Sequence, residues 1–392
     1  MNLLDRSFGA CVVVALLAST PAPAQKNPQS LFSPTVADKL NSTIAGIMTT
    51  NNLPSVAVDV SIPGKGRYVF VHGAADLATG SPRDARQPFR IASLTKTFVA
   101  TAVLQLVDRG RLRKTDPLAK WYPDFPNADK ITVDDLLRMR SGIAAPSDEQ
   151  LAAAVYDEPT APASTLAEMM AQAAALARDF QPPNQKTVYT NLNYDILGGI
   201  VQQVTGVDVG AFITENIVKP LGLHQTRYPI GDDLPGGLHG YGFNPRTQRF
   251  EDKAELNPAL AGPAGAMISS LDDLRRYVRV LCVGGLLTPR TQRERLQGQA
   301  LAGSTTEYGE GVITGPNVCG HGGTIPGFST EMYYVPAWDA TLAVSVSRLD
   351  RDDAIQTTPV TTAVSNALIE DFGSPAQRPI RVVPERVFQH GK

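Results

Sequence analysis

The chain has 392 residues, of which 43% are hydrophobic and 19% are charged, and its formal net charge is −2 at pH 7. This composition is that of a globular protein with a sizeable core, and the length favours two or three domains, or one large domain with a subdomain. The small net charge and the lack of a long basic run argue against nucleic acid as a partner.

The N-terminus has the pattern of an export leader. The apolar stretch "FGACVVVALLA" (8–18) is too short to span a bilayer comfortably, and "APA" (22–24) supplies a small-x-small cleavage pattern. We therefore expect residues 1–24 to be a signal peptide cleaved after Ala24. The mature protein is then secreted or periplasmic, without stable membrane insertion. A membrane anchor is the alternative, and the short apolar run disfavours it.

Two cysteines, Cys282 and Cys319, remain after this cleavage. In an oxidising compartment they can form a disulfide, but two cysteines far apart in sequence are equally often buried thiols, so the sequence leaves both states open. The chain has no Cys-x-x-Cys and no His-Glu-x-x-His. No metal site or cofactor is therefore predicted.

The expected elements change type twice along the chain. A helix over 35–52 precedes a β-hairpin (54–64 and 66–76), and helices then dominate as far as residue 282. Strands return at 308–315, 327–336 and 339–348, before a last helix at 357–372. This order predicts an α/β domain built from both ends (25–97 and 265–375), a mainly helical domain inserted between them (98–264) and a C-terminal tail (376–392).

Between the N-terminal hairpin and the last group of strands, five helices are expected. Three of them carry a boundary signal: Gly110 can end the helix that follows residue 93, Thr132-x-x-Asp135 resembles a capping box, and Ser270 can cap a later start. The ranges that show helical spacing are 131–143, 164–178, 193–206 and 269–282, and a glycine-rich connection is expected at 235–250. The cleft between two such domains is the default ligand site.

Ser93 and Lys96 form a Ser-x-x-Lys pair in "IASLTKTFVA" (91–100). Residues three apart lie on one side of a helix, and the apolar positions from Leu94 to Val107 have helical spacing. At the first turn of such a helix, free N–H groups favour negative charge developing on Ser93, and a neighbouring lysine can act as the base that its hydroxyl needs. The alternative is Ser93 as a helix cap and Lys96 as a solvated side chain.

A second motif, "YTNLNYDILGG", places Tyr189 and Asn191 just before a helix. A tyrosine near lysines can act as general acid or base, and an asparagine amide can bind a substrate amide through its donor and its acceptor. The alternative is a tyrosine that packs by its ring and an asparagine that caps the helix.

A third motif, "CGHGGTIPGFSTEMYYV", contains His321 and Gly323 at the start of a strand-like region. Glycines here would allow a substrate backbone to pair with the strand edge. The amide N–H of Thr324 would then face the N–H of Ser93 across a carbonyl oxygen, as an oxyanion hole. The alternative is a glycine-rich hairpin with an incidental histidine.

These three motifs, in this order and each at an element boundary, resemble the serine β-lactamase and penicillin-binding-protein superfamily. The best fit is its branch of class C β-lactamases and D-alanyl-D-alanine carboxypeptidases (peptidase family S12). Further segments that resemble the branch are "ITVDDLLRMRSGI" and "KPLGLHQT". The resemblance implies a β-lactamase/transpeptidase-like α/β fold, in which helices flank an antiparallel sheet built from both termini and an all-helical domain is inserted. It implies no cofactor.

The resemblance also implies roles for individual residues. Ser93 would be the acylated nucleophile and Lys96 its activating partner. Tyr189 would pass a proton to the leaving group and later activate the deacylating water. The residues implied to bind the substrate are Asn191, His321, Gly323 and Thr324. The backbone amides of Ser93 and Thr324 would form the oxyanion hole.

The third motif departs from the β-lactamases of this branch, which usually carry Lys-[Thr/Ser]-Gly. No such tripeptide occurs in the chain, and His321-Gly322-Gly323 stands in its place. A histidine is mostly neutral at pH 7 unless a carboxylate raises its pKa, and the absent hydroxyl removes a donor to a substrate carboxylate. Both changes disfavour efficient β-lactam hydrolysis.

The function we expect is therefore an exported serine hydrolase that acts through an acyl-enzyme on D-amino-acid-containing peptides or related amides, like a DD-carboxypeptidase or a D-aminopeptidase. Its partner would be a small peptide, an amide or a β-lactam. The alternatives are a β-lactamase, an esterase of the same family, or a non-catalytic penicillin- or peptidoglycan-binding protein. Retention of Asn191 favours an amide over an ester, and a pure binder has no need of Ser93, Lys96 and Tyr189 together.

Overall fold

The structure is a computed structural model that describes residues 32–144, 155–229, 236–244, 246–351 and 355–374, together with residues 380 and 382. The leader expected at 1–24 lies outside the described residues, as does all of the tail at 376–392 except residues 380 and 382.

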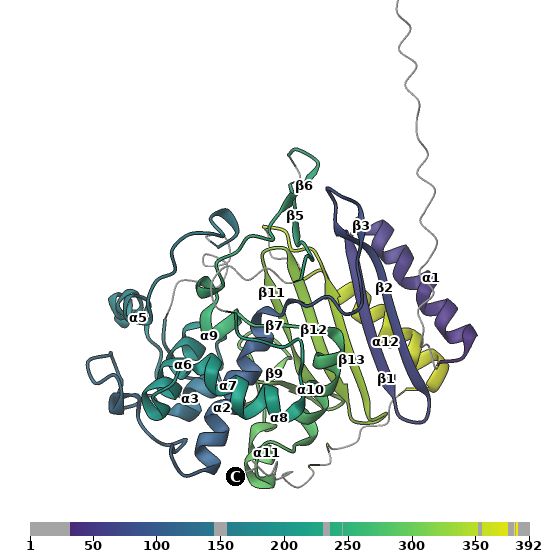
Figure 1. The fold of residues 1–392 in the computed structure, drawn as a ribbon. Coiled ribbons are helices and arrows are strands. Elements are labelled where there is room, and N and C mark those ends of the chain that lie inside the picture. Colours follow the sequence, from purple (N-terminus) through teal and green to yellow (C-terminus); the bar gives the residue numbers. More distant parts are fainter. Residues whose placement is uncertain are drawn as a thin grey trace, which may run out of the picture.

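One antiparallel sheet joins the two ends of the chain (Figure 1). Its strand order is β3-β2-β1-β13-β12-β11-β10-β9-β8, so the N-terminal hairpin lies directly beside the last strand, with Val56 opposite Val346. The nine strands are β1 (Ser55–Ile62), β2 (Gly66–Asp76), β3 (Ser81–Pro82), β8 (Gln299–Ala300), β9 (Glu307–Tyr308), β10 (Ile313–Gly315), β11 (Val318–Ile325), β12 (Phe328–Val335) and β13 (Ala340–Val346). The expected sheet, built from both termini and flanked by helices, is confirmed.

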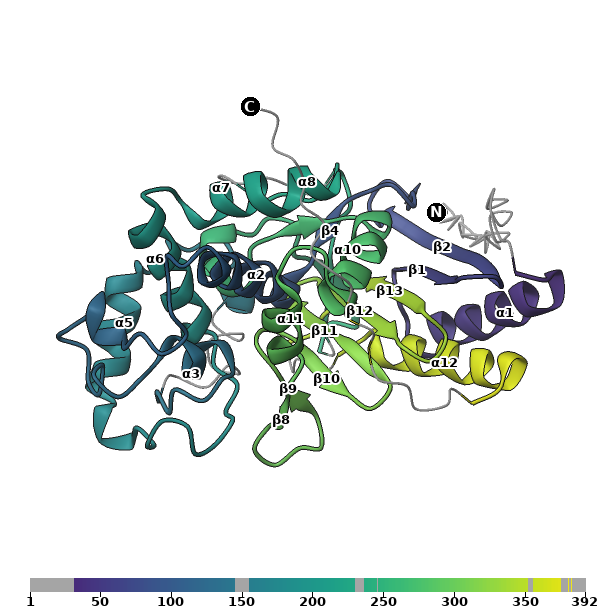
Figure 2. The same ribbon diagram turned by 90° about the horizontal axis from the view of Figure 1, so that it is seen from below.

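Helices cover both faces of this sheet because side chains alternate along each strand. On β1, Val56, Val58 and Val60 pack with helices α1 (Pro34–Thr50) and α12 (Thr358–Phe372), which lie side by side on one face (Figures 1 and 2). Ala57 points to the other face, which α10 (Leu271–Val283) covers. The second face carries the larger core, and the candidate site lies on that side.

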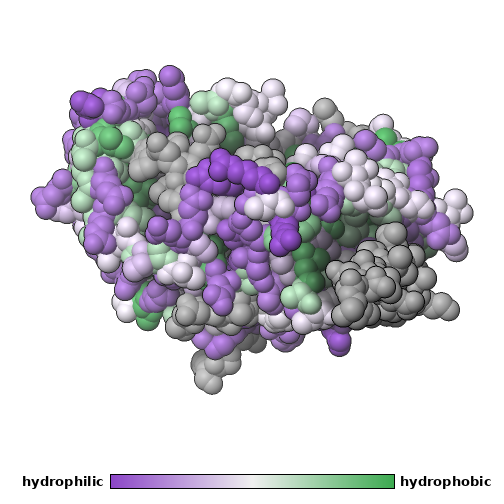
Figure 3. All heavy atoms as spheres, turned by 90° about the horizontal axis from the view of Figure 1, so that it is seen from above, coloured by the Kyte–Doolittle hydropathy of each residue, from purple (hydrophilic) through white to green (hydrophobic). Residues whose placement is uncertain are grey.

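The helical part of the chain packs against the second face and supplies one wall of the site (Figure 2). Its helices are α2 (Thr95–Asp108), α3 (Val133–Leu137), α5 (Leu166–Ala175), α6 (Leu192–Thr205), α7 (Val209–Ile213), α8 (Lys219–Leu221) and α9 (Gly262–Gly265), followed after α10 by α11 (Pro289–Arg295). Turns of 3-10 helix occur at Leu118–Lys120, Ala177–Asp179 and Pro258–Leu260, and a π-helical turn occurs at Thr214–Val218. The face seen in Figure 3 is mainly hydrophilic, with hydrophobic residues in small separate patches.

No single helix in the described ranges has the length and hydrophobicity needed to cross a membrane. Only the combination of Leu192–Thr205 with Val209–Leu221, bent by 78°, meets these two criteria.

Most expected helix boundaries agree with the structure, and the exceptions have local causes. Gly110 and Gly206 take the left-handed conformation that ends α2 and α6. The Thr132 capping box is present, but α3 stops at Leu137, well before residue 143, because Met139 turns to a positive φ of 58°. The glycine-rich connection expected at 235–250 also contains the start of a small hairpin, β5 (Tyr241–Asn244) and β6 (Arg249–Asp252).

Candidate active site

Ser93 lies in a strained turn between a short strand pair and α2. The turn is a 3-10 helix (Ala92–Leu94) that follows β4 (Phe89–Arg90), which pairs with β7 (Ile268–Ser269). Ala92 has a φ of +49°, a left-handed conformation that costs a non-glycine residue roughly 1–3 kcal/mol. The neighbouring backbone holds this strain.

Two hydrogen bonds fix the turn from outside. The Ile91 N–H donates to the Met267 carbonyl, and the Met267 N–H donates to Thr95 Oγ1, each at 3.0 Å. The serine is therefore positioned by contacts on both sides of it, in a turn just before α2 rather than within the helix.

Lys96 is buried and points at Ser93. Its side chain is inaccessible to solvent, and Nζ donates to Ser93 Oγ at 2.8 Å and to the Ala264 carbonyl at 2.8 Å. The same Nζ lies 5.0 Å from the centre of the Tyr189 ring. The alternative of a solvated lysine is therefore wrong, and the two residues of the Ser-x-x-Lys pair are in direct contact.

Tyr189 and Asn191 lie just before α6 and line the cleft. The Tyr189 ring is half-buried and packs edge-on against the Tyr308 ring, with centroids 5.8 Å apart. Asn191 occupies the cap position of α6, but its side chain makes no capping hydrogen bond to the helix. The alternative in which Asn191 caps through its amide is therefore wrong.

His321 is neutral and hydrogen-bonded through both ring nitrogens. Nδ1 lies 2.5 Å from the Gly322 carbonyl and Nε2 lies 3.2 Å from the Tyr308 hydroxyl. Because a carbonyl only accepts, Nδ1 carries the proton, and Nε2 accepts from Tyr308. Burial, together with the nearby charge of Lys96, lowers the pKa of His321 to about 3. The imidazole therefore offers no positive charge to a ligand carboxylate at neutral pH.

Tyr308 is a site residue that the sequence analysis did not single out. It lies on β9, is almost completely buried, and links His321 to the Tyr189 ring. The only signal in the sequence was its place in the strand-like segment "YGEGVITG", which indicates a strand but not a contact with a histidine thirteen residues later.

Gly323 brings strand β11 against the serine turn. A Cβ atom at Gly323 would lie 2.6 Å from the Ile91 carbonyl oxygen and 2.8 Å from the Ser93 nitrogen, closer than real Cβ atoms approach. Only glycine therefore fits here, and the reason that the structure shows is packing against the chain's own turn. The close approach also brings the next residue, Thr324, toward Ser93.

A single cleft of about 660 Å³ contains these groups. Lys96 lies behind it, buried under Ser93. The expected site residues that line the cleft are Ser93, Tyr189, Asn191, His321, Gly323 and Thr324. In the described part of the chain, no three His, Cys, Asp or Glu side chains gather closely enough to hold a metal ion.

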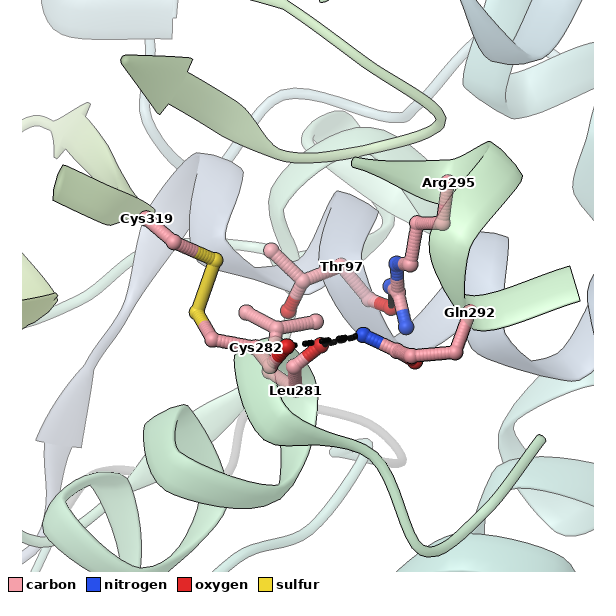
Figure 4. Close-up of a disulfide and its surroundings, with 6 residues drawn as sticks. All are labelled: Thr97, Leu281, Cys282, Gln292, Arg295 and Cys319. Atoms are coloured by element: carbon pink, nitrogen blue, oxygen red, sulfur yellow. Dashed lines mark hydrogen bonds between the residues drawn. A yellow bond between two sulfur atoms is a disulfide. The ribbon is translucent and has the colours of Figure 1, made fainter. Parts of the chain in front are cut away.

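A disulfide anchors the strand that carries His321. Cys282 on α10 and Cys319 on β11 are both buried and are bonded to each other (Figure 4). Gln292 on α11 donates to the Leu281 and Cys282 carbonyls at 2.9 and 3.0 Å. The disulfide state, which the sequence left open, is therefore the one that the structure contains.

Helix α11 also contacts α2, the helix that carries Lys96 (Figure 4). Arg295, a buried side chain on α11, donates to the Thr97 carbonyl at 2.9 Å. Helices α10 and α11, strand β11 and the start of α2 are thus fastened together behind the cleft.

We expect loss of this disulfide to lower the stability of the fold without removing any residue of the candidate site. The bond closes a segment with a sequence separation of 37 residues, for which a loss of about 2–4 kcal/mol is typical. In a chain of this size that is a fall in Tm of roughly 2–5 °C. The measurement is thermal unfolding of the wild type and a Cys282→Ala/Cys319→Ala double variant, each with and without reductant.

The double variant is its own control, because reductant should leave its Tm unchanged. An equal Tm for the oxidised and reduced wild type, with both cysteines open to alkylation before reduction, would contradict the bond.

Comparison with known proteins finds a matching family and several relatives. The family model described as Beta-lactamase matches residues 40–364. Penicillin-binding protein 4 of Amycolatopsis lactamdurans is 29% identical over 247 residues, which are 60% of this chain and 61% of that protein. Esterase EstB of Burkholderia gladioli is 25% identical over 338 residues, or 76% of this chain and 86% of the esterase.

The fold is also found among solved structures. A D-stereospecific amidohydrolase from Streptomyces sp. superposes with a TM-score of 0.71 at 26% identity, over 83% of this chain and 98% of that one. Against the first three curated relatives, however, the match spans only 48% to 61% of their length.

Proposed function

We propose that this chain, which belongs to the Beta-lactamase family, is a serine hydrolase that forms an acyl-enzyme on Ser93. The observation that carries the proposal is the 2.8 Å contact between Lys96 Nζ and Ser93 Oγ at the edge of an open cleft. A nucleophile in direct contact with its base is the arrangement that acyl transfer by a serine requires.

The acylation step uses groups that already lie together. Ser93 Oγ gives its proton to the base formed by Lys96 and Tyr189, and its oxygen attacks the substrate carbonyl carbon. The carbonyl oxygen takes up the electron pair, and the backbone amides of Ser93 and Thr324 stabilise its negative charge. When the carbon–nitrogen bond breaks, Tyr189 returns the proton to the leaving amine. Water, activated by Tyr189, then hydrolyses the ester.

The substrates we propose are small D-amino-acid-containing peptides or related amides. Asn191 supports an amide, and a D-stereospecific amidohydrolase is among the structures this chain resembles. A β-lactamase is the second candidate, but the neutral His321 and the glycine at 322 lack the charge and the hydroxyl that would hold a β-lactam carboxylate. A penicillin-binding protein and an esterase are among the relatives. A non-catalytic penicillin-binding protein and an esterase are therefore the remaining candidates, and the experiment below tests both.

Export to an oxidising compartment is part of the proposal. The N-terminal leader pattern supports it, and so does the buried Cys282–Cys319 bond, since disulfides persist in secreted and periplasmic proteins and are rare in the reducing cytosol. A periplasmic or secreted place would also put the enzyme beside cell-wall peptides.

The first experiment is the intact mass of the protein after mixing with benzylpenicillin, followed over time alongside the loss of the drug. We expect an adduct of one penicillin per chain that decays slowly. The contact between Ser93 and Lys96 supports acylation, whereas the Lys-[Thr/Ser]-Gly motif of the β-lactamases is absent from the sequence. Fast loss of penicillin without an adduct would make the protein a β-lactamase. Neither an adduct nor hydrolysis of any amide, peptide or ester would overturn the acyl-enzyme proposal.

A further inference from the structure

The glycine at 322 leaves a gap in one wall of the cleft. A Cβ atom there would lie 3.7 Å from Glu331 Cγ and 3.8 Å from the Tyr333 hydroxyl, which is ordinary contact. Packing therefore does not demand glycine at this position, in contrast to Gly323, where a Cβ collides with the serine turn. What the glycine does is leave Glu331 and Tyr333 open to the cleft, and both residues line it.

The strand register explains how one ligand can meet both Ser93 and Glu331. Gly322 lies opposite Glu331 in the β11–β12 ladder, so these two positions share a face, whereas Gly323 faces the serine turn. Within the described residues β10 pairs with β11 only at 318–320, so the β11 edge beyond His321 is not covered by β10. A ligand that lies along this edge has one side toward Ser93 and the other toward Glu331.

Glu331 is a buried carboxyl that has no cationic partner among the described residues. It is 7% exposed, accepts a hydrogen bond from the Thr361 hydroxyl, and has the Tyr333 hydroxyl 3.5 Å from Oε1. In the part of the chain that the structure describes, no Lys, Arg or His forms an ion pair with it. Burial accordingly raises the pKa of Glu331.

A second buried carboxyl shows the usual arrangement. Glu310 is fully buried, and both Lys114 and Arg138 lie 2.7 Å from its Oε1. Burying a carboxylate without such a partner is costly, and a group that brings a positive charge to it regains that free energy. Glu331 differs from Glu310 in that it faces an open cleft, from which the positive charge can come with a ligand.

We propose that Gly322, Glu331 and Tyr333 form a subsite that binds an ammonium group of the substrate. The inference rests on the proposed function and narrows it: the preferred substrates are amides or peptides with a free amine close to the scissile carbonyl. The ammonium donates to the Glu331 carboxylate and to the Tyr333 oxygen. A substrate with a free carboxylate at this point would meet a like charge, so a DD-carboxypeptidase activity is disfavoured.

The test compares matched substrates that differ only in one amine. One pair is D-alanine p-nitroanilide and its N-acetyl form, with the amine on the acyl side. The other pair is N-acetyl-D-alanine 2-aminoethylamide and its terminally acetylated form, with the amine on the leaving group. We expect the free amine of one pair to raise kcat/KM about tenfold or more, since hydrogen bonds to charged groups have this order of effect. The pair in which the free amine raises kcat/KM shows whether the acyl side or the leaving group of the substrate lies beside Gly322.

Two variants assign the preference to the subsite. Glu331→Gln keeps the size of the side chain and removes its charge, and we expect the ratio of kcat/KM for amine over acetylated substrate to fall about tenfold. Gly322→Val fills the gap and leaves the Glu331 carboxyl chemically unchanged, and it should lower the same ratio. The control is Glu370→Gln, which removes an exposed carboxylate on α12 that pairs with Lys39, and should leave the ratio as in the wild type.

The outcomes separate the two proposals. A wild-type enzyme that hydrolyses these substrates without preferring either amine, or an amine preference that survives in both Glu331→Gln and Gly322→Val, overturns the subsite and leaves the proposed function standing. Failure to hydrolyse any of the substrates, together with failure to be acylated by penicillin, overturns the proposed function and the subsite with it.

Discussion

Replacing Ser93 with alanine is expected to abolish both turnover and covalent labelling by penicillin. The variant lacks the hydroxyl oxygen that Lys96 Nζ contacts at 2.8 Å and that would carry the acyl group, so no acyl-enzyme can form on it. Loss of a serine nucleophile typically costs 10⁴-fold or more in kcat, and what remains comes from binding and oxyanion stabilisation. The measurements are kcat/KM on a D-amino acid amide and the intact mass after exposure to benzylpenicillin.

A structural control accompanies this variant. Ser42 is exposed on α1, which lies on the opposite face of the sheet from the candidate site. Ser42→Ala should therefore keep wild-type activity and labelling. The Tm of Ser93→Ala should stay close to that of the wild type, because only one hydroxyl is removed. Labelling that persists in Ser93→Ala would place the nucleophile elsewhere and refute the site.

The second large effect is expected at Lys96. Lys96→Met places an apolar side chain of similar length where the native lysine is buried, and this side chain can neither accept nor donate a proton. We expect acylation to slow by about 10²–10⁴-fold, the usual contribution of a positioned base. Lys96→Arg should be as inactive, since a guanidinium stays charged and cannot take the Ser93 proton.

The pair of substitutions separates charge from proton transfer. If Lys96 acted only as a positive charge near the serine, arginine would restore much of the rate, and this result would contradict its role as base. The control Lys120→Met removes a half-exposed lysine that pairs with Asp116, and its acylation rate should equal that of the wild type. The measurement is stopped-flow or mass-resolved acylation, with circular dichroism to confirm that each variant is folded.

Local patterns predicted much of the fold. The hairpin at the N-terminus, the helix that follows Ser93 and the strands near the C-terminus all depend on periodicity and turn residues within a short window. The shortened α3 shows the limit of that information, because its end depends on the left-handed Met139, which no spacing rule predicts. The pairing of β1 with β13 comes from the order of strands and helices rather than from any local signal.

The site was predictable as a set of residues but not as a geometry. Ser93 and Lys96 are one helical turn apart, so their contact follows from sequence spacing. The approach of Tyr189 and His321 depends on packing between distant segments, and so does the link through Tyr308. The glycines at 322 and 323 look alike in sequence, yet one is forced by a backbone collision and the other leaves space. The roles assigned to these residues remain predictions for the variants above to test.

The pairing of Val56 with Val346 has a consequence for the order in which the molecule assembles. Strand β1 cannot pair with β13 until almost the whole chain has left the ribosome, and contacts of such high sequence separation slow folding. The turn that carries Ser93 belongs to the early part of the chain, whereas β11 belongs to the late part. A half-finished chain therefore holds the proposed nucleophile without the strand that we propose to complete the oxyanion hole, and the candidate site is complete only with the last strands.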